Sequence, residues 1–298
     1  MSVKVTVPAT TANLGAGFDC IGAALSRYNR FEFSLLDADS PKLQMTVSGA
    51  EAAQVSTDES NLVYQSFAKV YASLGKTPPP VKIAIELGIP LARGLGSSAT
   101  AIVGGLVGAN VLAGNPLRKT EIMEMAIAME GHPDNVVPAF LGGCRLAADR
   151  TICEIPWHSN VIPVIAIPNF ELSTEAARSV LPTEISRADA IFNIAHLGLF
   201  LRALETGNHE WLRVALQDKL HQPYRKHLIP GYDAVREAAI AAGADEMVIS
   251  GAGPTLLALT KEESASAVAN AMQKAWETQG IQVEARSLSL DTQGARWE

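Results

Sequence analysis

The sequence has few cysteines, no excess of basic residues and no apolar segment at its start. Its three cysteines, Cys20, Cys144 and Cys153, show no C-x-x-C spacing. An odd and sparse set of this kind is typical of reduced thiols in the cytosol. The opening "MSVKVTVPAT" alternates as a strand does, which does not resemble a secretory signal. We therefore expect free thiols and a cytoplasmic location.

Charge excludes one large class of partner. The chain carries 24 basic and 31 acidic residues, a net charge of −7. Nucleic-acid-binding domains usually show a basic patch, so we expect no nucleic-acid partner. Small anionic ligands remain compatible with this balance, because local donors and metals bind them. The 298 residues, 48% of them hydrophobic, are enough for one large domain or two ordinary ones.

A long uncharged run extends from Gly94 to Leu117. It is long enough to span a bilayer. However, it contains six glycines together with serine, threonine and asparagine residues, and few large apolar side chains. We expect a helix buried inside a soluble protein, and no membrane partner.

Hydrophobic periodicity predicts a mixed α/β (α+β) fold. Strands are expected at residues 3–7, 30–36, 42–49 and 81–87, and helices at 61–75, 97–113 and 119–130. A new series of strands and helices begins after Trp157, where we place a domain boundary. It has a buried strand at 161–168, two strands around a glycine turn at 244–260, a helix at 264–280 and a last strand at 281–290.

The stretch "IPLARGLGSSAT", residues 89–100, is rich in glycine and small polar residues. It lacks the lysine of a Walker loop, and Gly75-Lys76-Thr77 has valine where that motif needs its first glycine. Gly94 to Ala99 fits G-x-G-x-x-[GA], but the second strand and acid of a dinucleotide site are missing. Two interpretations remain: a phosphate site at a helix N-terminus, or a tight strand–helix turn with Ser97 as N-cap.

Two further segments carry polar residues beside glycines. In "VPATTANLGAGFDC", residues 7–20, Thr10, Thr11, Asn13 and Asp19 could bind a ligand, or Asp19 could be an N-cap. In "MEGHPDNVVPAFLGG", residues 129–143, Glu130 ends a helix, where a carboxylate is disfavoured by about 0.3–1 kcal/mol. A bound cation would reverse this cost, although a solvated glutamate is also common.

The residues that follow Glu130 are also candidates. His132, Asp134 and Asn135 are expected in a loop stiffened by Pro133. His132 could be a metal ligand, but no second histidine stands at zinc spacing, so zinc is excluded.

Together, "VPATTANLGAGFD", "PLARGLGSSAT" and "ISGAGPT" resemble the three signature motifs of the GHMP kinase superfamily, in that order. The first is similar to that of the homoserine kinases, and the Gly-Glu-His feature of the sugar kinases is missing. The resemblance covers nearly the whole chain. It implies a ribosomal-protein-S5-like domain at residues 1–157 and a ferredoxin-like domain at 158–298. It also implies ATP-dependent phosphorylation of L-homoserine to O-phospho-L-homoserine, a step toward threonine.

The resemblance also implies residue roles. Asn13, Asp19 and His132 would contact homoserine, with Asp19 facing its ammonium. Thr174, Arg178 and Arg225 would hold its carboxylate, and Gly251 and Gly253 would form a turn that closes the site. Ser98 and Glu130 would bind Mg²⁺. The ATP phosphates would be cradled by Pro90, Leu91, Ala92, Arg93, Gly94, Leu95, Gly96, Ser97, Ser98, Ala99 and Thr100.

The chemistry implied is phosphoryl transfer without a dedicated base, in which Asn135 steadies the transition state. No carboxylate near the motifs is left unassigned. Many homoserine kinases have extra residues between the glutamate and the His-x-Asp-Asn sequence, whereas here Glu130 and His132 are two apart.

Two alternatives stay open: another kinase of the superfamily, acting on mevalonate-type or sugar substrates, and a non-catalytic ligand sensor. Asp19 with Arg178 and Arg225 favours a zwitterionic substrate, while Ser98 and Glu130 favour catalysis. The expected partners are small molecules, L-homoserine and ATP, and a homodimer is compatible with the sequence.

Overall fold

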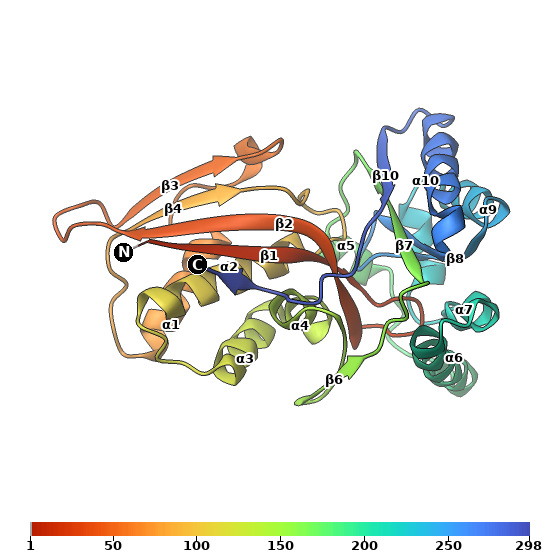
Figure 1. The fold of residues 1–298 in the computed structure, drawn as a ribbon, viewed down its shortest axis with the longest axis horizontal. Coiled ribbons are helices and arrows are strands. Elements are labelled where there is room, and N and C mark those ends of the chain that lie inside the picture. The colour runs from red at the N-terminus through yellow and green to blue at the C-terminus, as the bar shows by residue number, and fades with distance from the viewer. Residues whose placement is uncertain (1) are drawn as a thin grey trace.

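The computed structural model describes residues 2–298, which form two sheets with helices packed on them (Figure 1). The first sheet has seven strands, in the order β11-β1-β2-β4-β3, with β5 paired to β2 and β6 paired to β5. Only β3 and β4 pair in parallel; the other pairs in this sheet are antiparallel. Its strands are β1 (Ser2–Ala12), β2 (Ile21–Leu35), β3 (Leu43–Ser48), β4 (Val81–Glu86), β5 (Cys144–Ala148), β6 (Thr151–Ile155) and β11 (Arg296–Trp297).

The first sheet shares its core with helices from the same half of the chain. These are α1 (Leu62–Ser73), α2 (Ser97–Leu112), α3 (Lys119–Glu130) and α4 (Pro133–Leu141), and η1 (Ala52–Gln54) is a short 3-10 turn. Most of α2 is buried, and its glycines let it approach the sheet closely. A Cβ at Gly104 would lie 2.5 Å from the ring of Phe31, and one at Gly108 would lie 2.3 Å from that of Phe33.

The uncharged run from Gly94 to Leu117 therefore contains a buried helix, as expected. Nowhere in residues 2–298 does a helix have both the length and the apolar character that a membrane crossing requires.

The second sheet has the order β10-β7-β9-β8 and is antiparallel throughout. It consists of β7 (Ile162–Pro168), β8 (Ala244–Ile249), β9 (Leu256–Thr260) and β10 (Val283–Ser287). Alternate side chains of β7 enter two different cores. Val164 and Ala166 pack with α9 (Tyr232–Ala241) and α10 (Glu262–Glu277). Ile165 and Ile167 share a core with α6 (Arg187–Thr206), α7 (His209–Ala215) and residues of the first half of the chain.

Three short helical segments complete the second half: α5 (Thr174–Ser179), α8 (Gln222–Arg225) and η2 (Lys226–Leu228). The core shared by the two halves includes Ile21, Ile89 and Leu95 from the first half and Val248 and Leu257 from the second. The two sheets are thus joined by buried apolar side chains.

The mixed α/β class and the expected elements are confirmed, with two differences. The segment from Pro133 is a helix, so the prediction of a loop at Asp134 and Asn135 is wrong. His132 is the N-cap of α4, and Pro133 suits the first helical position because its φ is fixed and its missing N–H would have no partner there. The last strand is β11, which follows β10 and pairs with β1.

The domain boundary near Trp157 stays a prediction. It falls between β6, in the first sheet, and β7, in the second. The pairing of Thr6 with Arg296 returns the end of the chain to the first sheet. A single boundary in the sequence therefore does not separate the residues of the two sheets.

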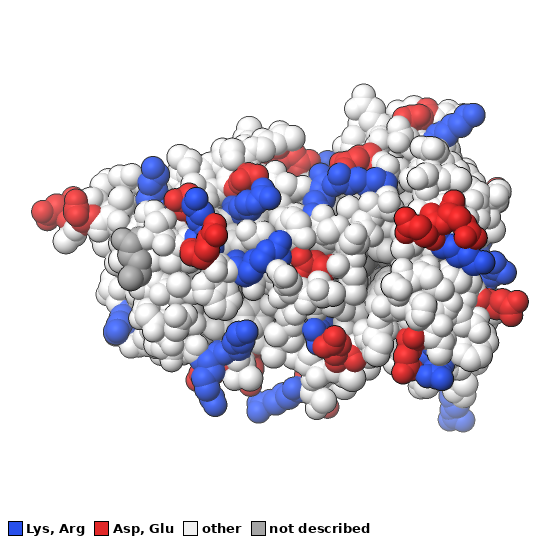
Figure 2. Space-filling model, in the orientation of Figure 1, with Lys and Arg blue, Asp and Glu red and all other residues white. Residues whose placement is uncertain are grey.

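Among the described residues on the face drawn in Figure 2, basic and acidic side chains are interspersed. The absence of a nucleic-acid partner stays a prediction from the composition.

Candidate active site

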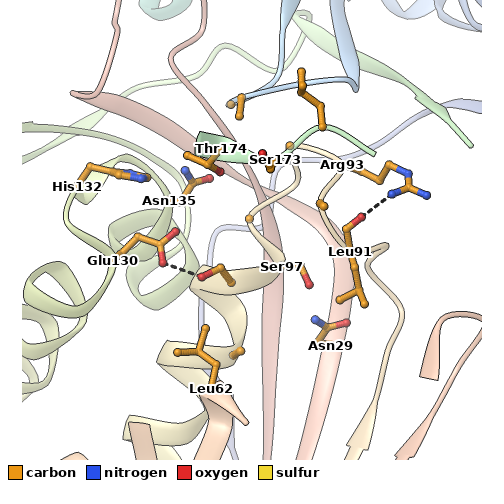
Figure 3. Close-up of a pocket in the computed structure, with 18 of the residues that line it drawn as sticks. Asn29, Leu62, Leu91, Arg93, Ser97, Glu130, His132, Asn135, Ser173 and Thr174 are labelled. Carbon is orange, nitrogen blue, oxygen red and sulfur yellow. Dashed lines mark hydrogen bonds between the residues drawn. The ribbon is translucent and has the colours of Figure 1, made fainter. Parts of the chain in front are cut away.

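A cavity of about 460 Å³ lies where the motifs of the two halves meet, a volume typical of small-molecule sites (Figure 3). Most of the residues singled out from the sequence line it, namely Asn13, Asp19, Leu91, Ala92, Arg93, Gly94, Gly96, Ser97, Ser98, Glu130, His132, Asp134, Asn135, Thr174, Arg178, Arg225 and Gly251. Among the described residues, seven candidates do not line it: Thr10, Thr11, Pro90, Leu95, Ala99, Thr100 and Gly253. Leu95, Ala99 and Thr100 are buried in the protein instead.

Hydrogen bonds join the three motifs to one another. The amide of Thr10 donates to the carbonyl of Leu95 at 3.1 Å, which ties the first motif to the glycine loop. The amide of Gly251 donates to the carbonyl of Ala12 at 3.1 Å. The Ser250 hydroxyl donates to the carbonyl of Gly94 at 2.7 Å. Segments from both ends of the chain therefore form one wall of the cavity.

The glycine loop ends in a helix N-terminus without a side-chain cap. Gly96, with φ of 67° in the left-handed region, is the N-cap of α2, and no side chain among residues 2–298 caps this helix. The alternative with Ser97 as N-cap is therefore wrong. Ser97 and Ser98 line the cavity, so the helix end and its free N–H groups border it. Such an end favours an anion.

The two loop glycines are also required by contacts within the protein. A Cβ at Gly94 would lie 2.2 Å from the carbonyl oxygen of Ser250, and one at Gly96 would lie 2.0 Å from Oγ1 of Thr10. Both glycines have positive φ. Packing between the motifs is therefore a reason for glycine here, beside the close approach of phosphates expected from the sequence.

The side chain of Arg93 is committed to the protein. It is buried, and its guanidinium donates to the carbonyls of Leu91 at 2.7 Å and Pro168 at 3.1 Å. It also forms ion pairs with Glu51 and Glu171, both at 3.3 Å. Arg93 thus ties the glycine loop to the second sheet, and we expect it to reach a nucleotide only through its backbone.

The two predicted metal ligands lie together (Figure 3). The hydroxyl of Ser98 donates to Oε2 of Glu130 at 2.9 Å. Burial raises the pKa of Glu130. The hydrogen bond from Ser98 acts in the opposite direction, with a smaller effect. Oxygen donors of this kind suit Mg²⁺. Their role in metal binding stays a prediction.

A second group of possible ligand atoms comes from Asp19, His132 and Asp134, which lie within 4.8 Å of one another. These groups already have protein partners. Nδ1 of His132 lies 2.5 Å from Oδ1 of Asp134, and this hydrogen bond raises the pKa of His132. Asp19 is paired with Arg178. Within residues 2–298 Glu130 forms no ion pair and has only the hydrogen bond from Ser98, so the pair of Ser98 and Glu130 is the better metal candidate.

Asp134 corrects the expectation that no carboxylate near the motifs is left unassigned. It is buried and lines the cavity. Its neighbour Asn135 accepts a hydrogen bond from the Thr10 hydroxyl at 2.7 Å and donates weakly to Asp134 at 3.4 Å. Proline at a helix start was the signal in the sequence that could have placed Asp134 and Asn135 in the first turn of α4.

A strained turn after β1 presents Asn13 and Asp19. Both have positive φ, of 71° and 57°, which non-glycine residues rarely adopt. The Asn13 side chain donates to the carbonyl of Gly251 at 2.8 Å and accepts from the amide of Asp19 at 2.9 Å. Strain of this kind is often found at functional sites.

Two arginines and one aspartate gather beside this turn. Arg178 binds both carboxylate oxygens of Asp19, at 2.9 and 2.7 Å. Arg225 is 2% exposed and donates to the carbonyls of Ala177 at 3.0 Å and Gly251 at 3.1 Å. Burial, together with the charge of Arg178, lowers the pKa of Arg225 to about 10. Thr174, at the start of α5, lines the same cavity (Figure 3).

The aromatic ring of Phe18 lies close to both arginines. The guanidinium carbons of Arg178 and Arg225 lie 5.7 and 5.1 Å from its centroid, within the range of cation–π attraction.

The apolar end of the cavity was not predicted from the sequence. It is lined by Asn29, Phe31, Val55, Leu62, Val63, Ile85 and Leu87. Asn29 is buried and fixed, because it donates to Thr100 at 2.8 Å and accepts from the amides of Gly88 and Ile89 at 3.0 Å. Phe31, Leu62, Val63 and Ile85 lie in strands or a helix where apolar residues are expected in a core, so the sequence carried no signal of a binding surface there.

Comparison with known proteins supports the resemblance. Residues 61–143 match the model of the GHMP kinases N terminal domain, and residues 200–278 match that of the GHMP kinases C terminal domain. Homoserine kinase of Microchaete diplosiphon is 69% identical over 298 residues, covering 99% of this chain and 96% of the relative. Homoserine kinase of Nostoc punctiforme (strain ATCC 29133 / PCC 73102) is 67% identical, covering 99% and 98%.

Solved structures agree with these relatives. The crystal structure of homoserine kinase from Cytophaga hutchinsonii ATCC 33406 is 30% identical with a TM-score of 0.91, covering 100% of this chain and 97% of that chain. A mevalonate kinase structure that is 16% identical, with a TM-score of 0.74 and coverage of 97% and 99%, shares the fold. The two-domain GHMP kinase fold expected from the motifs is confirmed, and the chain belongs to the homoserine kinase family of the GHMP kinases.

Proposed function

We propose that this chain transfers the γ-phosphoryl group of ATP to the hydroxyl of L-homoserine, giving ADP and O-phospho-L-homoserine. The observation that carries the proposal is the content of one cavity. It borders a free helix N-terminus, which suits phosphates, and it also holds Asp19 with Arg178 and Arg225, which suit a zwitterion.

ATP would lie along the cavity with its base at the apolar end beside Asn29. The residues there, such as Leu62 and Leu87, offer a surface for a flat ring. The triphosphate would then follow the glycine loop from Leu91 to Ser98, where the backbone N–H groups at the start of α2 stabilise negative charge.

Ser98 and Glu130 would hold Mg²⁺. The two side chains are hydrogen-bonded, and the partly buried Glu130 carboxylate gains from a nearby cation because partial burial disfavours its charged form. When bound, the ion supplies positive charge that offsets the charge of the phosphates.

Homoserine would lie at the opposite end, with its ammonium at Asp19 and its carboxylate at Arg178 and Arg225. Asp19 and Arg178 already pair side by side, so an ammonium and a carboxylate can each bind one partner of this pair without a change in net charge. Asn13 and Thr174 line the same end and supply polar contacts.

Transfer then depends on alignment and charge stabilisation more than on covalent chemistry. Asn135 is held by Thr10 beside the glycine loop, where its amide can steady the charge that develops during transfer. Because Oδ1 of Asp134 faces both His132 and Asn135, we assign Asp134 to orienting these two side chains.

The charges of the site also favour homoserine over the other substrates of the superfamily. Mevalonate has a carboxylate but no ammonium, and sugars have neither, so neither substrate requires Asp19 beside the two arginines. The test is ADP release measured with homoserine, mevalonate and galactose at equal concentrations. Homoserine should be strongly preferred, and a preference for mevalonate or galactose would overturn the assignment.

We also propose that the chain forms a homodimer and works in the cytoplasm. Ile191 and Ile194 on α6 are 60% and 71% exposed, and a second copy would remove such side chains from water. All three cysteines are free within residues 2–298, as is typical of a reducing compartment. Sedimentation of the wild type and of Ile194→Asp tests the assembly: the variant should be monomeric, whereas a monomeric wild type would refute it.

A further inference from the structure

A buried histidine lies behind the arginines of the candidate substrate site. His221 is the N-cap of α8, the short helix that ends in Arg225, and its side chain is completely buried. Its ring stacks on Phe18 with centroids 5.2 Å apart. Phe18 in turn lies against the guanidinium groups of Arg178 and Arg225. No motif drew attention to His221 in the sequence.

The partners of the ring fix its tautomer. Nε2 of His221 lies 2.9 Å from the carbonyl oxygen of Gly15, which can only accept, so Nε2 carries the hydrogen. In a neutral ring, Nδ1 then has a free lone pair. NH1 of Arg225 lies 3.4 Å from this Nδ1 and donates to it. Burial lowers the pKa of His221, which keeps the ring neutral and Nδ1 able to accept.

The ring is held by a rigid support. The carboxylate of Asp218 accepts from the amides of Leu220, His221 and Gln222 at 2.9, 2.9 and 2.7 Å, and from the side chain of Asn193 at 2.7 Å. The start of α8 and the ring of His221 therefore have one well-defined position, since four donors converge on one buried carboxylate.

The guanidinium of Arg225 is anchored to the protein at two of its three nitrogens. Nε donates to Ala177, and NH1 is shared between Gly251 and His221. Within residues 2–298, NH2 of Arg225 has no hydrogen-bond partner, although the residue lines the cavity. Two nitrogens are thus anchored by the protein, and the third is left for a ligand.

We propose that His221 is a positioning residue for the reaction: by accepting a hydrogen bond from NH1 of Arg225, its Nδ1 aims the remaining face of that guanidinium at the carboxylate of the substrate. The inference rests on the proposed function, because it takes homoserine as the substrate. A planar guanidinium grips a carboxylate only in a narrow range of orientations, so a group that fixes its plane improves binding of the carboxylate.

Two amide substitutions separate the roles of the two ring nitrogens of His221. In His221→Gln the amide reaches the place of Nε2 and can still donate to Gly15, but the acceptor for Arg225 is lost. In His221→Asn the amide oxygen takes the place of Nδ1 and can still accept from Arg225. We expect His221→Gln to raise KM for homoserine about tenfold or more, the scale of a hydrogen bond to a charged group, with KM for ATP unchanged. In His221→Asn, KM for homoserine should stay close to the wild-type value.

An analogue without the carboxylate gives the readout that a purely structural role would not produce. The inhibition constant of 3-aminopropan-1-ol, which is homoserine without its carboxylate, should be equal for the wild type and His221→Gln. His209→Gln is the matched control, because His209 is a largely buried histidine that pairs with Asp245 at 2.5 Å and does not line the cavity. It should lower the melting temperature without a selective effect on homoserine.

The inference is overturned if the inhibition constant of the analogue rises together with KM for homoserine, if His221→Asn is as impaired as His221→Gln, or if His209→Gln shows the same selective effect. A wild-type enzyme that does not phosphorylate homoserine would instead refute the proposed function. The two failures are therefore distinguishable in one set of assays.

Discussion

Replacing Glu130 by glutamine should reduce catalysis while leaving the metal-free fold intact. Glutamine keeps the size of the side chain and an oxygen that can accept from Ser98. What it removes is the negative charge at the C-terminus of α3, where burial already raises the pKa of Glu130. The substitution therefore separates the role of the charge from the role of the shape.

The sign of the stability effect follows from the raised pKa. The stability associated with the protonated side chain is complete below the ordinary pKa of 4.5 and is lost as the pH rises through the raised value. At neutral pH the metal-free wild type therefore bears the cost of a partly buried charge, and Glu130→Gln does not. Its melting temperature without Mg²⁺ should be at least that of the wild type.

Turnover should change in the opposite direction. Without the carboxylate we expect turnover to fall about 10²-fold or more, the scale of losing one electrostatic stabiliser. The increase in melting temperature on addition of Mg²⁺ and ATP should also be smaller than in the wild type. Ser98→Ala should reduce turnover in the same way.

The assays are initial rates over a range of Mg²⁺ concentrations and calorimetric melting with and without ligands. Glu124→Gln is the control, because Glu124 lies on the same helix but is exposed and does not line the cavity. Turnover of Glu130→Gln equal to that of the wild type at limiting Mg²⁺ would refute the metal assignment.

Three further predictions test other parts of the site. Arg178→Leu and Arg225→Leu should each weaken homoserine phosphorylation by roughly 2–5 kcal/mol while ATP affinity is kept, with the smaller loss at the part-exposed Arg178; normal homoserine kinetics would contradict this. Gly96→Val should lose ATP binding in calorimetry and also lower the melting temperature, unlike Gly198→Ala on α6, where a Cβ meets nothing within 4 Å and φ is not positive; normal ATP binding would show that the loop is only a turn. The lowered pKa of His221 contributes stability that is complete above its ordinary value of 6.5 and is lost as the pH falls, so melting of His221→Asn should depend less on pH below 6.5.

Much of the fold could be predicted because most elements follow simple periodicity. The strand at 81–86 alternates buried and open positions, and α2 is uncharged because it is buried on nearly all sides. The helix α4 was not predicted because Pro133 was interpreted as stiffening a loop, although proline suits a first helical turn. The two residues of β11 are too short to give any periodic pattern, and only pairing with β1 defines them.

The site was predictable where motifs marked it and not elsewhere. Ser98, Glu130 and Asp19 stand beside glycines or helix ends, so local chemistry indicated them. Asn29 and His221 have no such neighbours in the sequence, and their place in the site depends on contacts between distant segments. The ring of His221, for example, bonds to Gly15, 206 residues away.

The position of the loop glycines suggests why the three motifs occur together. Gly94 lies against Ser250, and Gly96 lies against Thr10, each closer than a Cβ would allow. The same turn that contains Ser250 supplies the carbonyl of Gly251, which accepts from both Asn13 and Arg225. A change in the phosphate loop would therefore also displace the turn that orients the carboxylate-binding arginine. Because phosphoryl transfer requires donor and acceptor in one geometry, binding both ends of the site to a single turn fixes that geometry through direct hydrogen bonds.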